Sequence, residues 1–141
     1  MEPKILLVGE KLEHRAFNGS NQALPWLASS LYNNGFPNVV QFDMENGQNT
    51  LDRLLHQSET SDLILFAGTF STQLAQIDAH ASILKGHLGS RNKDVPIIIG
   101  GYGASGVDRY SEHAPFINSF FYGPGIEQVA KIAESVAKGN F

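Results

Sequence analysis

Glycine stands at the carboxyl end of four of the five β-strand-like segments in this sequence. The glycines are Gly9, Gly68, the pair Gly100 and Gly101, and Gly123. In an open parallel sheet these ends share one edge, where a side chain would keep a flat ligand away from the backbone. Glycine also serves strand-to-helix turns with positive φ, which leaves a structural role open at each position. As a set, these glycines predict a ligand-binding edge cleared of side chains.

A glycine-rich hexapeptide at residues 101–106, Gly-Tyr-Gly-Ala-Ser-Gly, has the G-x-G-x-x-G spacing of dinucleotide-binding loops. That fingerprint normally opens the first βαβ unit and is followed about 20 residues later by an acidic residue that holds the ribose. Residues 119–122 at that distance are Ser-Phe-Phe-Tyr. We therefore expect neither NAD nor FAD, although consecutive small residues still allow the backbone to approach a ligand and its phosphate.

The chain also lacks the residues required for two other functions found in α/β folds of this kind, phosphoacceptor signalling and flavin mononucleotide binding. A phosphoacceptor receiver needs acidic side chains after the first and third strands, where this chain has Gly9 followed by Glu10, and Ala67 followed by Gly68. A flavin mononucleotide site favours a loop rich in hydroxyl groups and glycine, and residues 10–15 are instead charged. Neither a receiver nor a flavodoxin proper is expected.

Histidine is the other residue type that could carry chemistry, and the chain has five. His80 and His87 are about two turns apart on one expected helix, too distant to share a metal ion, and we expect both to be exposed to solvent. His14 lies in the polar segment 10–22, from which it could reach a ligand. No catalytic triad, carboxylate pair or P-loop is evident, so we assign no catalytic or metal-ligating residue. A small-molecule enzyme that uses His14 and Glu10 remains an open alternative.

Strands and helices alternate along the whole chain. Short β-branched or aromatic runs predict strands at Lys4–Gly9, Val39–Asp43, Asp62–Ala67, Val95–Ile99 and Phe116–Tyr122. Apolar residues at intervals of three and four predict helices at Asn21–Asn34, Thr50–Gln57, Thr72–Leu88, Val107–His113 and Ile126–Ala137. Gly35 and Gly89 are expected to close two of them in the left-handed conformation. The pattern predicts a doubly wound, three-layer α/β/α fold, flavodoxin-like, with a five-stranded parallel sheet in the order 2-1-3-4-5.

The bulk composition limits the class of protein. At 141 residues with 42% hydrophobic and 17% charged residues, we expect one domain over residues 1–141 with its own core. A net charge of −4 without a basic cluster argues against nucleic acid. The absence of cysteine excludes disulfides and cysteine-ligated clusters from this chain. The first apolar run is too short for a signal peptide or a membrane span, so we expect a cytoplasmic protein with no membrane partner.

The order of these segments resembles the cobalamin (vitamin B12)-binding domain found at the N-terminus of cobalamin-dependent radical S-adenosylmethionine enzymes. The resemblance covers nearly the entire chain: Lys-Ile-Leu-Leu-Val-Gly at 4–9, Asn-Gly-Phe at 34–36, and Pro-Ile-Ile-Ile-Gly-Gly at 96–101. Residues 121–127, Phe-Tyr-Gly-Pro-Gly-Ile-Glu, are similar to that family's Gly-Glu-Gly-Glu signature. The resemblance implies a corrin ring on the carboxyl edge, with its nucleotide tail passing between strands.

From the edge glycines and this resemblance we expect the cofactor site to involve fourteen residues. Gly100, Gly101 and Gly103 would let the tail approach, and Thr69, Ser71, Tyr122 and Glu127 would be its polar neighbours. The full set is Gly9, Glu10, Gly68, Thr69, Phe70, Ser71, Gly100, Gly101, Tyr102, Gly103, Tyr122, Gly123, Gly125 and Glu127.

The chain lacks the Asp-x-His-x-x-Gly motif that supplies a lower axial histidine to cobalt in many cobalamin proteins. Leu12 and Phe17 stand where an Asp-x-His-x-x-Gly motif around His14 would need Asp and Gly. The resemblance therefore implies cobalamin bound base-off, with no histidine ligand from this motif. The expected role is that of a carrier or cofactor domain, not catalytic alone, working with a radical S-adenosylmethionine or methyltransferase protein. The alternative is a cofactor-free interaction or regulatory domain, with Phe70, Tyr102 and residues 10–22 as its partner surface.

Overall fold

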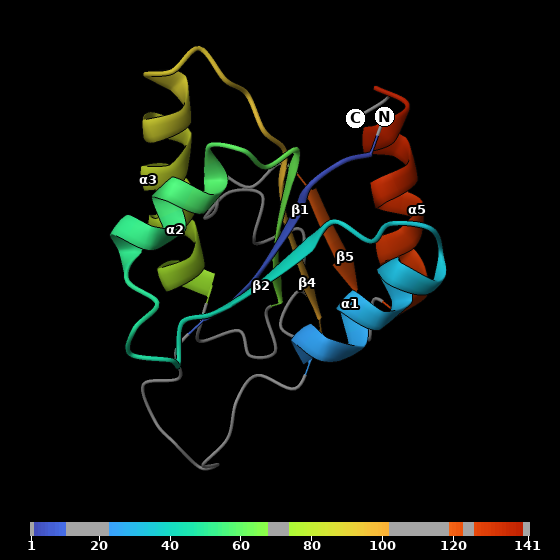
Figure 1. Ribbon diagram of the computed structural model, residues 1–141. Coiled ribbons are helices and arrows are strands. Elements are labelled where there is room, and N and C mark those ends of the chain that lie inside the picture. Colours follow the sequence, from blue (N-terminus) through green and yellow to red (C-terminus); the bar gives the residue numbers. More distant parts are fainter. Residues whose placement is uncertain (1, 11–22, 68–73, 102–118, 123–125, 140–141) are drawn as a thin grey trace.

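A parallel β-sheet forms the middle layer of the protein (Figure 1). The structure is a computed structural model that describes residues 2–10, 23–67, 74–101, 119–122 and 126–139. The sheet has the order β2-β1-β3-β4-β5, and every neighbouring pair is parallel. Its strands are β1 (Ile5–Gly9), β2 (Val39–Asp43), β3 (Leu63–Ala67), β4 (Ile97–Gly101) and β5 (Ser119–Tyr122). The expected α/β class with a flavodoxin-like parallel sheet is confirmed.

Helices cover both faces of this sheet (Figure 1). Helices α2 (Leu51–Ser58) and α3 (Leu74–Gly89) lie on one face, and α1 (Ala23–Asn33) and α5 (Ile126–Ala137) lie on the other. The short helix expected at residues 107–113 lies outside the described residues. None of the described helices is long and apolar enough to cross a lipid bilayer.

The core consists of two apolar clusters separated by the sheet, because successive side chains of a strand point to opposite faces. Between the sheet and α2 and α3, the buried side chains are Leu6, Val8, Phe42, Leu54, Ile64, Phe66, Ile77, Ala81, Leu84, Leu88, Val95, Ile97 and Ile99. Between the sheet and α1 and α5, they are Ile5, Leu7, Leu24, Leu27, Leu31, Leu63, Leu65, Ala67, Ile98, Val129, Ala133 and Val136. Continuous apolar runs such as Leu63–Phe66 are thus covered on both sides, as is typical of parallel sheets.

Strand β4 begins and ends two residues later than expected. Val95 and Pro96 precede it, and Gly100 and Gly101 belong to the strand itself. Proline has no N–H to give to a ladder, and Pro96 contributes only its carbonyl oxygen, which accepts from Ile64 N at 3.0 Å. Both glycines are therefore ladder residues in register with β5, where Gly100 pairs with Phe121 and Gly101 with Tyr122.

The ends of α1 and α3 differ in the residue that adopts positive φ. Gly35 follows α1 with φ +89°, as expected, and Phe36 N donates to Leu31 O at 2.9 Å. The expectation for Gly89 is wrong, because Gly89 is the last residue of α3 and the left-handed residue is Asn92, with φ 56°. Lys93 N then donates to Leu88 O at 2.9 Å. Asparagine tolerates this conformation better than other non-glycine residues, so the chain turns later than the glycine suggested.

Two glycine-to-alanine substitutions should change stability in opposite directions. Gly86 lies inside α3, is exposed, and an added Cβ would meet no atom within 4 Å. We expect Gly86→Ala to raise the free energy of unfolding by about 0.5–1 kcal/mol, because alanine has less freedom to lose on folding. Gly35→Ala should lower it by about 1 kcal/mol, because its φ of +89° strains any L side chain although the space is open. Urea unfolding followed by circular dichroism measures both, and shifts of the same sign would contradict this assignment.

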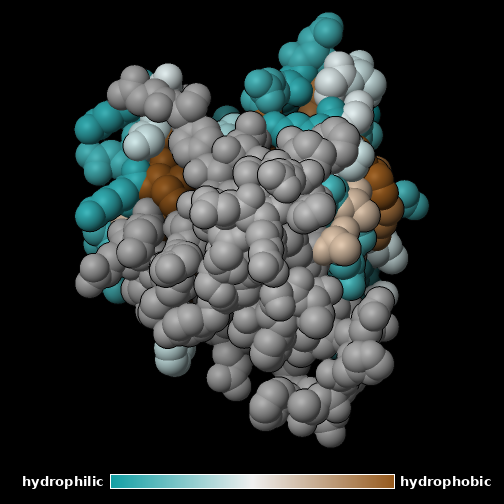
Figure 2. Space-filling view, turned by 180° about the vertical axis from the view of Figure 1, so that it is seen from behind, coloured by the Kyte–Doolittle hydropathy of each residue, from teal (hydrophilic) through white to brown (hydrophobic). Residues whose placement is uncertain are grey.

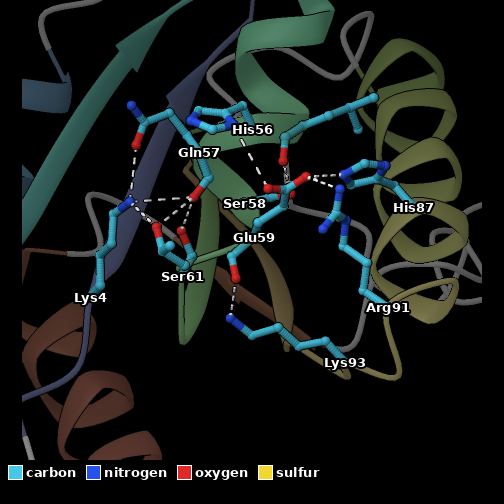
Figure 3. A network of polar contacts seen from close by, with 11 residues as sticks. Lys4, His56, Gln57, Ser58, Glu59, Ser61, His87, Arg91 and Lys93 are labelled. Atoms are coloured by element: carbon cyan, nitrogen blue, oxygen red, sulfur yellow. Dashed lines mark hydrogen bonds and ion pairs between the residues drawn. The ribbon is translucent and has the colours of Figure 1, made fainter.

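The end of α2 is anchored to the amino edge of the sheet by cations (Figure 3). Lys4 Nζ donates to Gln57 Oε1 at 2.9 Å and to Thr60 Oγ1 at 2.5 Å, and Lys93 Nζ donates to Glu59 O at 2.6 Å. Cations at the carbonyl end of a helix interact favourably with its dipole. Burial, together with the nearby charge of Lys93, lowers the pKa of Lys4.

The side chain of Glu59 joins this end of α2 to α3. Its Oε1 lies 2.8 Å from His87 Nε2 and 2.9 Å from Arg91 Nη2 (Figure 3). The hydrogen bond with His87, reinforced by the charge of Arg91, lowers the pKa of Glu59. These contacts lie at the edge opposite the strand ends that were expected to bind a ligand, so we interpret them as structural.

Candidate functional site at the carboxyl edge

The three central strands end in a row of minimal side chains. Gly9 of β1 is in register with Ala67 of β3, and Ala67 is in register with Gly100 of β4. We call these three residues the small-residue row. All three are buried, and the row stands two residues beyond Leu7, Leu65 and Ile98, which are fully buried in the core. Across three adjacent strands, only one methyl group projects from the backbone at this level.

The alternation of the strands places the small-residue row on the face covered by α1 and α5. Ala67 belongs to the core cluster on that face, and Gly9 and Gly100 follow Leu7 and Ile98 of the same cluster by two positions. At this edge the order of the strands reverses between β1 and β3, which is where open α/β sheets bind their ligands. The row therefore offers bare backbone at the position where this fold places a ligand.

On the opposite face, the residue that follows β1 is a buried carboxylate. Glu10 is 1% exposed, and it is the only charged residue among the buried residues that the structure describes. Its Oε2 accepts from Gln76 Nε2 at 2.6 Å, and its Oε1 lies 2.5 Å from His80 Nδ1. Gln76 and His80 are four residues apart on α3, so they occupy the same side of the helix. Burial of a charge is costly without such partners, so a charged pair here marks a candidate functional position.

The pair fixes the protonation pattern of the imidazole. An ionised carboxylate only accepts hydrogen bonds, so His80 carries a proton on Nδ1 and donates it to Glu10. This hydrogen bond raises the pKa of His80 above its ordinary value of 6.5, the charge of Glu10 adds to the rise, and partial burial opposes it. The side chain of His80 is 19% exposed while that of Glu10 is wholly buried. The accessible edge of the ring is therefore the one away from Nδ1.

The raised pKa of His80 predicts a pH dependence of stability. A group whose pKa is higher in the folded state than in the unfolded state stabilises the fold. This contribution is fully present below the unfolded pKa, here about 6.5, and is lost as pH rises through the folded pKa. We therefore expect the free energy of unfolding to fall as pH rises from 6.5 toward that higher pKa. His80→Gln should flatten the curve over this interval. Urea unfolding across this pH range is the measurement, and an unchanged slope in the variant would contradict the prediction.

The expectation that His80 and His87 are solvent-exposed is wrong. Their side chains are 19% and 26% exposed, and each pairs with a carboxylate from a distant segment, Glu10 or Glu59. His80 lies near the middle of α3 and His87 in its last turn, and each side chain reaches a neighbouring segment. Within the described residues, no group of three or more histidine, aspartate or glutamate side chains is placed to hold a metal ion.

Six of the fourteen expected cofactor residues lie among the described residues. Gly9 and Gly100 are brought together across Ala67, Gly101 and Tyr122 are paired neighbours, and Glu10 joins α3. Glu127 is the second residue of α5. His14 and the remaining eight lie outside the described residues; the eight are Gly68, Thr69, Phe70, Ser71, Tyr102, Gly103, Gly123 and Gly125.

Sequence reasoning missed three residues of this edge: Ala67, Gln76 and His80. Ala67 could have been found, because a single small residue ends an otherwise bulky apolar strand. For His80, the available signal was its spacing of four from Gln76 and three from Ile77, a residue buried against the sheet. That spacing places His80 at the margin of the buried stripe, away from the centre of the solvent face.

No protein-family model matches the chain, and a search of curated proteins found no match to its sequence. Solved structures share its fold. The apo, selenomethionine-labelled cobalamin-dependent S-adenosylmethionine radical enzyme OxsB matches with a TM-score of 0.77 at 17% identity. The same enzyme with aqua-cobalamin bound matches with a TM-score of 0.75, also at 17% identity. Each match covers 99% of this chain but 19% of the enzyme, so the chain spans about a fifth of that protein's length. The fold implied by the family resemblance is confirmed.

Proposed function

We propose that this chain is a corrinoid-binding module that holds cobalamin at its carboxyl edge. It would bind the cofactor base-off, without a histidine ligand from the protein, and serve as a carrier or cofactor domain. Its partner would be a radical S-adenosylmethionine or methyltransferase protein. The observation that carries the proposal is the small-residue row Gly9, Ala67 and Gly100, in a fold shared over nearly the whole chain with an enzyme described as cobalamin-dependent.

The described residues fit such a ligand in size and polarity. Three adjacent strands span about 10 Å, which is on the scale of a flat macrocycle. On the α1 and α5 side, the row leaves backbone that a ligand's tail could approach without meeting a side chain larger than methyl. On the α2 and α3 side, Glu10 and His80 supply polar groups near the outer margin of a flat ligand that lies on this edge. When bound, the cobalt of a corrinoid would supply the group-carrying chemistry, and the chain's own residues would bind and orient the cofactor.

Reconstitution tests the proposal. The purified chain is incubated with hydroxocobalamin, freed of unbound ligand by gel filtration, and examined by visible spectroscopy, with serum albumin as the control for nonspecific retention. We expect coloured protein at micromolar concentration. After reduction to Co(II), electron paramagnetic resonance should show cobalt lines without nitrogen splitting if binding is base-off and no histidine ligates the metal. Colourless protein would overturn the proposal, and nitrogen splitting would overturn its base-off form.

One observation favours the alternative of an interaction domain. Helix α1 contains no charged residue, and its Trp26 and Tyr32 are 66% and 68% exposed. On the face that Figure 2 shows, the coloured residues are mostly hydrophilic, with smaller hydrophobic areas. Trp26 is the only tryptophan, so its fluorescence reports on contacts of this face. A change in emission when a candidate partner protein is added, in a chain that fails to retain hydroxocobalamin, would favour the alternative.

A further inference from the structure

The position of His80 relative to the small-residue row points to a second contact with the same ligand. Gly9 and Glu10 are successive residues at the end of β1 and therefore face opposite sides of the sheet. The row lies toward α1 and α5, and the pair of Glu10 and His80 lies toward α3. A flat ligand resting across the ends of β1, β3 and β4 would have one margin over each side. The row and the histidine would then contact different parts of one molecule.

The available atom of His80 is its second ring nitrogen. Nδ1 donates to Glu10, and within the part of the chain that the structure describes Nε2 makes no hydrogen bond. The ring lies at the accessible side of the pair, since its side chain is 19% exposed and the carboxylate is wholly buried. Glu10, itself held by Gln76, fixes the ring orientation and therefore the direction in which Nε2 points.

The chemistry of this nitrogen selects the kind of group that it can bind. With Nδ1–H committed to Glu10, Nε2 accepts a hydrogen bond when the ring is neutral and donates one when the ring is protonated. The hydrogen bond with Glu10 raises the pKa of the ring above its ordinary value, which favours the protonated form that donates from Nε2. A primary carboxamide matches both forms, since its N–H groups donate and its carbonyl oxygen accepts. Carboxamides are also the polar groups around a corrin ring.

We propose that His80 Nε2 binds a carboxamide side chain at the margin of the corrin ring, while the small-residue row accommodates the nucleotide tail. The inference rests on the proposed function and deepens it by assigning the two faces of β1 to two parts of the cofactor. In this arrangement Glu10 is a positioning residue that orients His80. Ring and tail recognition are then separable by substitution.

Affinities for cobalamin and for cobinamide, which lacks the nucleotide, test this assignment. We expect His80→Gln to weaken binding of both corrinoids by about tenfold, the loss expected for one hydrogen bond with a charged group. His87→Gln is the matched control. It removes a histidine from the same helix that also pairs with a carboxylate, Glu59, but at the opposite edge of the sheet. It should leave both affinities unchanged.

A set of cobalamin monocarboxylates, each with one amide hydrolysed, identifies the contacted group. One isomer should bind the wild-type chain with a changed affinity, and His80→Gln should abolish that change, which is the signature of a direct contact. Unchanged affinity in His80→Gln, or equal losses in His80→Gln and His87→Gln, would overturn the inference while the function stands. Absence of all corrinoid binding by the wild-type chain would overturn the proposed function, and the inference with it.

Discussion

Replacing Gly100 with valine should weaken cobalamin binding on the order of 100-fold and leave cobinamide binding nearly unchanged. Gly100 lies near the carboxyl end of β4, in register with Ala67 of β3 and Phe121 of β5, on the face toward α1 and α5. Inserting side-chain atoms into a fitted space costs about 1–3 kcal/mol, and the upper end of that range corresponds to this loss. Cobinamide lacks the nucleotide tail, so it should escape the clash. Isothermal titration calorimetry with both corrinoids is the measurement.

The control for Gly100→Val is the same substitution at Gly86. That residue is exposed on α3, with no atom within 4 Å of an added Cβ. Gly86→Val should bind both corrinoids like the wild-type chain. Ala67→Leu, in the same row on the adjacent strand, should reproduce the effect of Gly100→Val. If a folded Gly100→Val chain, verified by circular dichroism and thermal unfolding, binds cobalamin with wild-type affinity, the role assigned to the small-residue row is wrong.

Phe66→Ala should lower the free energy of unfolding by about 3–5 kcal/mol, the range for deletion of a buried aromatic ring. Phe66 is fully buried in the central strand β3, and it lies in register with Val8 on β1 and Ile99 on β4. Neighbouring strands on both sides and the helices packed on this face surround Phe66. The surrounding structure therefore has little freedom to close the cavity that Phe66→Ala would leave. A domain is stable by about 5–15 kcal/mol, so this loss is a large fraction of the total. The midpoint and slope of urea unfolding give the value.

Two comparisons make the Phe66 result interpretable. Ile83→Ala on α3 removes an apolar side chain that is 42% exposed, and we expect a loss below about 1 kcal/mol. Phe66→Leu should fall between the two, because leucine fills part of the cavity. A Phe66→Ala loss as small as that of Ile83→Ala would mean that β3 is not the centre of the core.

Much of the fold could be predicted from local patterns. Short β-branched or aromatic runs indicated the strands, and apolar residues at intervals of three and four indicated α1, in which Leu24, Leu27 and Leu31 are buried. In α5 the same spacing is confirmed by the burial of Val129, Ala133 and Val136. The end of α3 was predicted less well, because the turn depends on Asn92 and not on the more familiar glycine.

The sequence by itself determined the alternation of strands and helices, the glycines that end the strands, and the resemblance that suggested a corrinoid. These features are readable because they depend on residues that are close along the chain. Only the tertiary structure decided that Gly9, Ala67 and Gly100 form one row, since that depends on the register among three strands. It also decided that Glu10 is buried against His80, 70 residues away. Such a pair has no local pattern, because the sheet and α3 must first pack together before the carboxylate leaves water and meets its partner.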